Sequence, residues 1–277
     1  MNESIVSCHP DAGTVRPLTG LYRDMDLPDH GRGGPFVYTN YIASLDGRIS
    51  VPAATGGQKV PDRIANARDW RLFQELAGHA DLLLSSGRYL REFEAGTAQD
   101  SLPVGTDPAF SDIHAVRARQ GLAPQPDVAV LSGRLDFAVP TRLLEQGRRV
   151  IVMTGEAATD ARVQAHERAG VEVIALPQGE QPGGNALATG LTRLGYRRIY
   201  AVAGPYVMHT LLSAQLLDAL FLTRVHRIIG GHPFASLCEG DLLPETGDFQ
   251  LTSMYLDAQG PGGCSQTFSR YDIVPAG

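Results

Sequence analysis

One carboxylate, Asp46, follows directly on a strand-like segment. The run from Tyr38 to Ala43 is rich in aromatic and β-branched residues, as a buried strand requires, and Ser44, Asp46 and Gly47 supply a polar turn after it. A carboxylate where a strand meets a cleft is suited to the floor of an active site. The same residues also suit a plain Asp-Gly turn between two strands of a hairpin, which would carry no chemistry.

A second segment has the form of an anion site. Ala203-Gly204-Pro205 follows a predicted strand and opens a predicted helix, with Pro205 at the expected first helical position. The free amide donors at such a helix start bind phosphate groups, so a dinucleotide pyrophosphate would fit there. The alternative is a helix start without a ligand.

Three basic residues could contact a substrate or a phosphate. Lys59 lies in a glycine-rich loop and is the single lysine beside 23 arginines. Arg63 could bind a substrate phosphate, or it could pair with Asp62 or Asp69. Arg88 could donate two parallel hydrogen bonds to phosphate oxygens, since the geometry of a guanidinium matches that of a phosphate group. Each of the three could equally be a solvated surface residue.

The order of elements predicts an α/β fold. From Phe36 onward, short apolar runs alternate with helical patterns, which is typical of a mostly parallel sheet with helices on both faces. About nine strands are predicted, over residues 36–44, 81–85, 127–131, 149–154, 171–175, 198–203, 219–229, 249–256 and 266–274. The last two strands are expected to form an antiparallel hairpin at the edge of the sheet.

Helices are predicted between these strands. Residues 61–80 place apolar side chains on one stripe and are interpreted as core scaffold, with Trp70 at the edge of the stripe. Further helices are expected from 159 or 160 to 170, from 185 to 195, and from 205 to 217. Residues 102–126 allow either a helix that begins at Asp107-Pro108 and ends at Gln120 or a mobile insertion over the cleft.

Length and charge restrict the class of protein. Residues 1–34 hold few large apolar groups and are expected to form an extended leader on the surface or on a partner subunit, followed by one domain over residues 35–277. With 24 basic and 30 acidic residues the net charge is -6, which gives no broad positive field for nucleic acid or an anionic membrane. No apolar run approaches the roughly 20 residues of a membrane span, and no signal segment is seen.

Several motifs are absent, and their absence excludes classes. Cys8, Cys238 and Cys264 show no CxxC or Cys/His spacing, so neither a disulfide framework nor a metal site is expected, and reduced thiols indicate a cytoplasmic protein. The sequence has no Gly-x-Ser-x-Gly elbow, no Walker loop and no Gly-x-Gly-x-x-Gly fingerprint. Hydrolases of the first type, P-loop nucleotidases and Rossmann dehydrogenases are therefore not expected.

Six segments resemble, in order, the reductase domain of bacterial riboflavin biosynthesis, a relative of dihydrofolate reductase. They are Ser-Leu-Asp-Gly-Arg-Ile at 44–49, Gly-Gly-x-Lys at 56–59, Ala-Asp-Leu-Leu-Leu at 80–84, Leu-Ser-Gly-Arg-Leu at 131–135, Ala-Gly-Pro at 203–205 and Ile-Gly-Gly at 229–231. The resemblance implies a dihydrofolate reductase-like fold, NADPH as cofactor, and reduction of a ribosylamino-pyrimidine phosphate or a related heterocycle. It also implies a homodimer.

The resemblance assigns roles to residues. Asp46 and Lys59 would be catalytic groups that orient the substrate and help to deliver a proton, and Arg88 could contact the 2′-phosphate of NADPH. Substrate-binding roles fall to Asn40, Ser44 and Arg63. Cofactor-binding roles fall to Ser86, Gly87, Arg88, Ala203, Gly204, Pro205, Gly230 and Gly231.

Two loops depart from the family pattern. Val202 and Ala203 stand where the family usually has the acid and first glycine of Glu-Gly-Gly-Pro, and Ser85-Ser86-Gly87 matches the usual Gly-x-Gly-Thr only in part. The zinc deaminase unit that often accompanies this reductase is not present. Three hypotheses follow: an NADPH-dependent pyrimidine reductase, a dihydrofolate or pterin reductase, and a non-catalytic ligand-binding homologue that has lost the cofactor.

Overall fold

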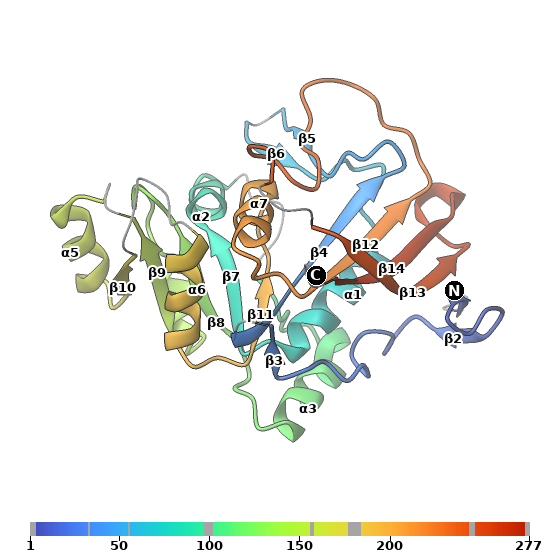
Figure 1. The fold of residues 1–277 in the computed structure, drawn as a ribbon, viewed down its shortest axis with the longest axis horizontal. Helices are drawn as coiled ribbons and strands as arrows, with labels where there is room; N and C mark the ends of the chain where they lie inside the picture. The colour runs from blue at the N-terminus through green and yellow to red at the C-terminus, as the bar shows by residue number, and fades with distance from the viewer. Residues whose placement is uncertain are drawn as a thin grey trace.

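A single mixed sheet organises the molecule. The computed structural model describes residues 4–32, 34–54, 56–96, 102–155, 158–176, 184–243 and 247–274. Over these residues the main sheet has twelve strands, in the order β10-β9-β8-β7-β11-β4-β12-β14-β13-β1-β2, with β3 paired to β4 (Figure 1). A separate two-stranded sheet joins β5 and β6.

The strands of the main sheet are β1 (Ser4–His9), β2 (Val15–Pro17), β3 (His30–Gly31), β4 (Gly34–Ser44), β7 (Leu82–Ser86), β8 (Asp127–Leu131), β9 (Val150–Thr154), β10 (Glu172–Ala175), β11 (Arg198–Ala201), β12 (Ala219–Val225), β13 (Phe249–Asp257) and β14 (Gln266–Ile273). The small sheet holds β5 (Val51–Pro52) and β6 (Gln58–Lys59). The helices are α1 (Ala67–His79), α2 (Gly87–Glu94), α3 (Ser111–Arg119), α4 (Thr141–Glu145), α5 (Asp160–Arg168), α6 (Gly184–Arg193) and α7 (Pro205–Ser213), with short 3-10 turns at Pro108–Phe110 and Pro261–Gly263.

The sheet is parallel in one half and antiparallel in the other. Strands β10, β9, β8, β7, β11, β4 and β12 pair in parallel. Strands β14, β13, β1 and β2 continue the sheet in antiparallel pairs. All nine predicted strands are present, and the C-terminal hairpin is confirmed. Its place at the sheet edge was wrong, because β1 and β2 lie outside it.

Each face of the sheet carries its own core. Along β4, Tyr38 packs into one apolar cluster and Val37 into another, because neighbouring strand residues point to opposite faces. Leu72 of α1 and Ile113 of α3 join the cluster of Tyr38. Leu187 and Leu211, of α6 and α7, join the cluster of Val37, so helices cover both faces as predicted.

The residues before position 35 are built into the sheet and the core. β1 pairs antiparallel with β13, and Leu18, Tyr22 and Leu27 are buried in the same cluster as Tyr38. The described residues of this leader thus add two paired strands and buried side chains to the domain, and neither was expected.

Residues 102–126 form a packed helix rather than a mobile insertion. Asp107 caps the 3-10 turn that leads into α3, and Ile113 of α3 is fully buried. The buried guanidinium of Arg117 donates hydrogen bonds to the carbonyls of Ala77 and Ala80, which lie in and just after the last turn of α1. The helix alternative is confirmed, and α3 supports the end of α1.

Candidate active site

The carboxyl ends of β4, β7 and β11 meet at one edge of the sheet. Strand β11 lies between β7 and β4, although all of the strands from β7 to β10 separate it from β4 in the chain. Helix α2 begins directly after β7, and α7 begins a few residues after β11. Ligands of open α/β sheets bind in the crevice that such a reversal of strand order creates.

A first cavity of about 320 Å³ lies at this edge. One wall comes from β4 and the small sheet, a second from the start of α1, and a third from α2 and the residues that precede α7. Its polar side chains belong to Asn40, Ser50, Gln58, Asp69, Ser86, Arg88 and Glu92, and its apolar side chains include Tyr41, Ile42, Ile49, Val60, Trp70, Phe73, Tyr89, Leu102, Val202 and Ala203.

A second cavity of about 780 Å³ adjoins the first. The two share Ser86, Arg88, Gly204 and Pro205, so the starts of α2 and α7 form their common rim. Three arginines, Arg88, Arg91 and Arg134, line the second cavity together with the carboxylates of Asp136, Glu239 and Asp241. Two helix N-termini at one rim are suited to anionic groups, because their first N–H groups have no partner within the helix.

The start of α2 is held tightly against the neighbouring strand. The Ser86 hydroxyl accepts a hydrogen bond from the backbone N–H of Tyr89 and caps the helix. At Gly87, an added Cβ would lie 2.8 Å from the Ser132 hydroxyl oxygen and 3.0 Å from the Phe137 ring. Glycine is required there by the chain itself, which places Ser132 of the β8 loop beside the helix start.

Gly204 is different, because the chain does not require a glycine there. Its φ is -75°, which any residue adopts, and no atom lies within 4 Å of the place where a Cβ would stand. The other glycines with such open space, among those whose surroundings are described, all have a positive φ. The space beside Gly204 opens into both cavities, as a site for close approach of a ligand would.

Six of the expected cofactor residues come together at this rim. Ser86, Gly87 and Arg88 line it from α2, and Ala203, Gly204 and Pro205 line it from the start of α7. Arg88 pairs with Glu92 one turn later, at 2.9 Å.

Gly230 and Gly231, also expected at the cofactor, line neither of these cavities. Both have a positive φ, which accounts for glycine in this turn.

Asp46 also lines neither cavity, and its expected role against substrate stays a prediction. Its Oδ1 accepts hydrogen bonds from the Ser44 hydroxyl at 2.5 Å and the Ile229 N–H at 3.2 Å. Its Oδ2 accepts from Arg48 at 2.5 Å and from the Gly230 N–H at 2.9 Å. The carboxylate thus ties the turn after β4 to the loop after β12.

The contacts of Asp46 also determine its protonation. Burial alone would raise the pKa of this carboxyl, but the hydrogen bonds from Ser44, Gly230 and Ile229 and the charge of Arg48 outweigh it and lower the pKa to about 2. A depressed pKa means that the stabilising contribution is present above the unfolded-state pKa and is lost as the pH falls toward 2.

Replacing Asp46 by asparagine is therefore expected to lower stability rather than to abolish chemistry. The melting temperature should drop by several degrees at pH 7. The gap to the parent protein should narrow from about pH 4 downward, because the unfolded parent chain takes up a proton there while the folded carboxylate stays charged until about pH 2. Circular dichroism melts across this pH range measure the gap. A variant of unchanged stability that has lost turnover would instead restore the catalytic assignment.

Of the residues predicted to bind substrate, Asn40 lines a cavity and Ser44 does not. Asn40 lines the first cavity, where its Oδ1 accepts a hydrogen bond from the Tyr200 hydroxyl. Ser44 is fully buried, and its hydroxyl donates to Asp46.

Lys59 and Arg63 line neither cavity. The Lys59 ammonium pairs with Asp62 at 2.5 Å, and the Arg63 carbonyl accepts from Arg227. Their expected contacts with substrate stay predictions.

The first turn of α1 was missed as part of the site. The sequence pattern indicated core scaffold, yet Asp69, Trp70 and Phe73 line the first cavity. The available signal was a carboxylate beside the single tryptophan at the start of an amphipathic helix. Only the packing of α1 against the sheet shows that this turn faces a cavity. Among the described residues, no group of three or more His, Cys, Asp or Glu side chains could hold a metal ion.

Comparison with known proteins gives a consistent result. The family model of the RibD C-terminal domain matches residues 35–262. A curated protein of Archaeoglobus fulgidus, 2,5-diamino-6-ribosylamino-4(3H)-pyrimidinone 5′-phosphate reductase, is 24% identical over 208 residues, which are 75% of this chain and 87% of that protein.

Solved structures agree with this match. A pyrimidine reductase-like protein of Corynebacterium diphtheriae superposes with a TM-score of 0.66 at 22% identity, over 87% of this chain and 93% of the other. RibD of Acinetobacter baumannii gives 0.58 at 15% identity, over 88% of this chain and 59% of its own longer chain. The predicted dihydrofolate reductase-like α/β class is confirmed.

Proposed function

Because the chain belongs to the RibD C-terminal domain family, we propose that it is an NADPH-dependent reductase of a ribosylamino-pyrimidine phosphate. The curated relative is a reductase of such a compound. The observation that carries the proposal is the pair of adjoining cavities, which share a rim of two helix N-termini. The second cavity is lined by three arginines and three carboxylates, and the first is smaller and walled by aromatic side chains.

The residues present fit a dinucleotide cofactor. The open space beside Gly204 would let a cofactor group lie close to the backbone there. The starts of α2 and α7 offer N–H donors to phosphate oxygens. Ser86, Gly87, Arg88, Gly204 and Pro205 would hold the phosphates in the second cavity. When bound, NADPH would supply a hydride to the substrate.

The first cavity fits a flat polar ring. Trp70 and Phe73 stack at 5.0 Å between ring centroids with an interplanar angle of 16°, and both line the cavity. Asn40, Ser50 and Gln58 offer hydrogen bonds to the ring and its sugar. The work of these residues would be to bind and orient the accepting carbon and to exclude water, and most of the rate enhancement would come from positioning.

The reaction is tested by mixing the purified protein with NADPH and the ribosylamino-pyrimidine phosphate and following NADPH absorbance. Oxidation that depends on both substrate and protein supports the proposal. Turnover with dihydrofolate instead would favour the pterin alternative. No NADPH binding up to millimolar concentration, measured by fluorescence titration, would favour the non-catalytic alternative.

Arg134 is the best candidate for the 2′-phosphate that distinguishes NADPH from NADH. Of the three arginines in the second cavity, Arg88 pairs with Glu92 and Arg91 with Asp136. None of the ion pairs recorded for the described residues includes Arg134, whose side chain is exposed. An uncommitted guanidinium can bind a phosphate without first breaking a pair.

Replacing Arg134 by glutamine is expected to weaken NADPH binding by roughly tenfold, the loss of one charge-assisted contact, and to leave NADH binding unchanged. Fluorescence titration with each nucleotide measures the ratio. The same change at Arg168, an exposed arginine of α5 outside both cavities, is the control. An equal loss for both nucleotides would reject this role of Arg134.

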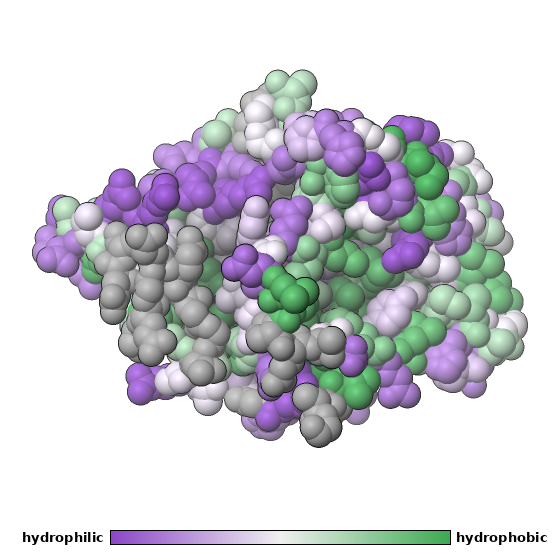
Figure 2. All heavy atoms as spheres, turned by 45° about the horizontal axis from the view of Figure 1, so that its top comes forward, coloured by the Kyte–Doolittle hydropathy of each residue, from purple (hydrophilic) through white to green (hydrophobic). Residues whose placement is uncertain are grey.

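Homodimer formation remains a prediction. Strand β12 offers no free apolar face to a partner, because it lies between β4 and β14 with all but one of its side chains buried. Val6, Val15 and Leu256 form one exposed cross-strand row on β1, β2 and β13. On the face drawn in Figure 2, apolar residues gather toward the right, the side of these strands in Figure 1.

The cellular location also remains a prediction. No helix in the described ranges has the length and apolar character needed to span a bilayer. The three cysteines are free, and a cytoplasmic location stays the expectation from their number and spacing.

A further inference from the structure

The side chain of Asn40 is held by a buried phenol. Asn40 lies on β4 and lines the first cavity, and its Oδ1 accepts a hydrogen bond from the Tyr200 hydroxyl of β11. Tyr200 lies opposite Tyr38 in the parallel register of the two strands, and Asn40 is the next residue of β4 on the same face of the sheet. The Tyr200 hydroxyl therefore reaches Asn40 from the core side of the cavity.

Tyr200 is fixed in its position. Its side chain is fully buried, and its ring stacks on that of Tyr38 at 5.0 Å between centroids with an interplanar angle of 9°. The ring of Phe73, which lines the cavity, lies 5.7 Å from that of Tyr200. Burial raises the pKa of the Tyr200 phenol well above its usual range, so the hydroxyl keeps its proton at neutral and mildly alkaline pH. Tyr200 is thus a permanent hydrogen-bond donor.

This phenol determines which end of the Asn40 amide faces the cavity. A side-chain amide has an oxygen that accepts hydrogen bonds and a nitrogen that donates them. Asn40 Oδ1 is the acceptor for the Tyr200 proton, so the oxygen is turned toward the core. Asn40 is only partly buried, and within the described part of the chain no hydrogen bond is recorded for its Nδ2. The two N–H groups are therefore left for a ligand in the cavity.

Gln58 repeats this arrangement at another wall. The Ser50 hydroxyl donates to Gln58 Oε1 at 3.3 Å, and both residues line the first cavity. No partner is recorded for the amide nitrogen of Gln58 in the described ranges. Each of these two amides thus has its oxygen occupied by a neighbouring hydroxyl and its nitrogen ready to donate. A cavity that presents N–H donors fits the acceptor atoms of a ligand, such as carbonyl and hydroxyl oxygens.

We propose that Tyr200 is a positioning residue, which fixes Asn40 as a hydrogen-bond donor so that the substrate binds with an acceptor oxygen against the Asn40 amide. The inference rests on the proposed function, since the ligand is the substrate of that same reaction. Tyr200 itself lines neither cavity, so its effect on the substrate passes through Asn40.

Replacing Tyr200 by phenylalanine should weaken substrate binding although the lining of the cavity is unchanged. Without the hydroxyl, Asn40 Oδ1 would be buried without a donor, and the amide is expected to rotate until its oxygen reaches water. If the donating orientation falls to about one tenth of the population, the apparent dissociation constant rises about tenfold. Fluorescence of Trp70, the single tryptophan and part of the cavity wall, measures binding of the ribosylamino-pyrimidine phosphate without turnover.

A double-mutant cycle tests whether Tyr200 acts through Asn40. Asn40→Ala should weaken binding roughly tenfold, and adding Tyr200→Phe to it should weaken binding no further. Two independent losses would multiply to about a hundredfold. Tyr38→Phe is the matched control, because it removes an equally buried hydroxyl that donates to the Leu76 carbonyl instead. This control variant should bind the substrate as the parent does.

Asn40→Asp tests which end of the amide faces the substrate. The change keeps the shape of the side chain and an acceptor for Tyr200, but it replaces the two N–H donors by a second acceptor oxygen. Because two acceptors would then face one another, binding should be weaker than in Asn40→Ala, by roughly a further tenfold. A substrate that donates to Asn40 would instead bind the new carboxylate at least as tightly as the parent amide, and this result would overturn the proposal.

The remaining outcomes separate this inference from the proposed reaction. Parent-like binding in Tyr200→Phe, or a double variant that multiplies the two losses, overturns the inference whether or not the protein oxidises NADPH. Coupled losses without any NADPH oxidation reject the proposed reaction and keep the role of Tyr200. The same coupling for NADPH in place of the pyrimidine would put the nicotinamide at Asn40 and overturn the assignment to substrate. Binding of neither ligand, by fluorescence and by calorimetry, would overturn both.

Discussion

Replacing Glu75 by alanine is expected to lower the free energy of unfolding by about 3–5 kcal/mol, because the buried N–H groups that donate to its carboxylate would lose their acceptor. Glu75 is fully buried on α1. Its Oε1 accepts hydrogen bonds from the Gly20 N–H and from Arg71 Nε, both at 2.7 Å. Its Oε2 accepts from the N–H groups of Tyr22 at 2.9 Å and Arg23 at 3.0 Å.

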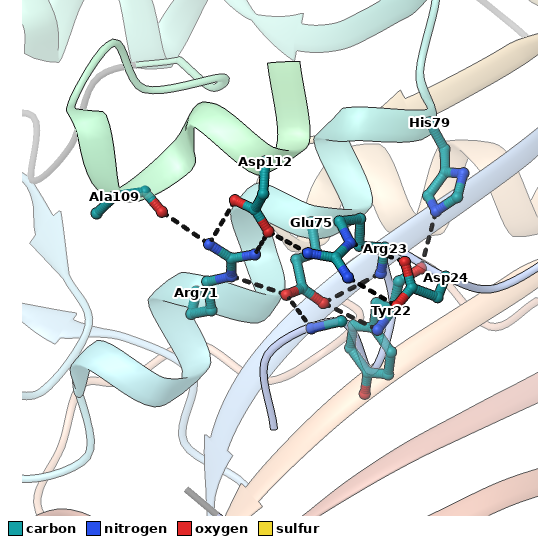
Figure 3. A network of polar contacts seen from close by, with 9 residues as sticks. Tyr22, Arg23, Asp24, Arg71, Glu75, His79, Ala109 and Asp112 are labelled. Atoms are coloured by element: carbon teal, nitrogen blue, oxygen red, sulfur yellow. Dashed lines mark hydrogen bonds and ion pairs between the residues drawn. The ribbon is translucent and has the colours of Figure 1, made fainter. Parts of the chain in front are cut away.

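The network around Glu75 joins three parts of the chain (Figure 3). Arg71 and Arg23 both pair with Asp112 of α3, and His79 of α1 contacts the Tyr22 carbonyl at 2.8 Å. Loss of Glu75 would leave three backbone N–H groups and the Nε–H of Arg71 without an acceptor, which is costlier than the loss of the bonds themselves. A cost of this size is a large part of the stability of a typical domain.

Urea unfolding followed by circular dichroism measures the effect. The matched control is Glu167→Ala, on an exposed face of α5, which should stay within about 0.5 kcal/mol of the parent. Hydrogen exchange should show faster opening of residues 18–25 in the Glu75 variant. A loss below about 1 kcal/mol would mean that the leader docks on α1 through its apolar side chains alone.

Replacing Gly204 by valine is expected to abolish NADPH binding while the protein stays folded. A Cβ at Gly204 would meet no atom of the chain, and its φ of -75° suits any residue, so the fold accepts the change at a cost of about 1 kcal/mol or less. The new side chain would stand in the space that both cavities share. We expect the dissociation constant of NADPH to rise on the order of a hundredfold, with alanine intermediate.

NADPH titration and a thermal melt of the same sample separate binding from folding. The control is Thr159→Val, at the start of α5, since Thr159 makes no side-chain capping bond and lies outside both cavities. NADPH affinity within threefold of the parent in the Gly204 variant would mean that the cofactor binds elsewhere, and the open space at Gly204 would then lose its explanation.

Strands of the parallel half could be predicted closely because they are buried on both faces. β8 has the predicted bounds, 127–131, since a continuous apolar run in a parallel sheet has the same length as the strand. β12 was predicted to continue to residue 229 but ends at Val225. The N–H groups of Ile229 and Gly230 donate to Asp46 instead, and local hydrophobicity does not reveal such a competitor.

The leader could not be predicted, because its order depends on distant partners. β1 alternates exposed and buried residues and pairs with β13, which lies more than two hundred residues away in the chain. Short polar segments of this kind form strands only where a sheet edge is present to pair with them.

By itself the sequence determined the class of fold, the order of the nine predicted strands and the helix start after Gly204. Local patterns suffice for these, because hydrophobic periodicity and a proline after glycine act within a few residues. Only the tertiary structure decided which polar groups line the two cavities. Asp46 forms an ion pair with Arg48, and Lys59 forms one with Asp62. Asp69, on a helix that was interpreted as scaffold, lines the first cavity. The direction and partners of a polar side chain depend on the elements packed around it, and these come from far along the chain.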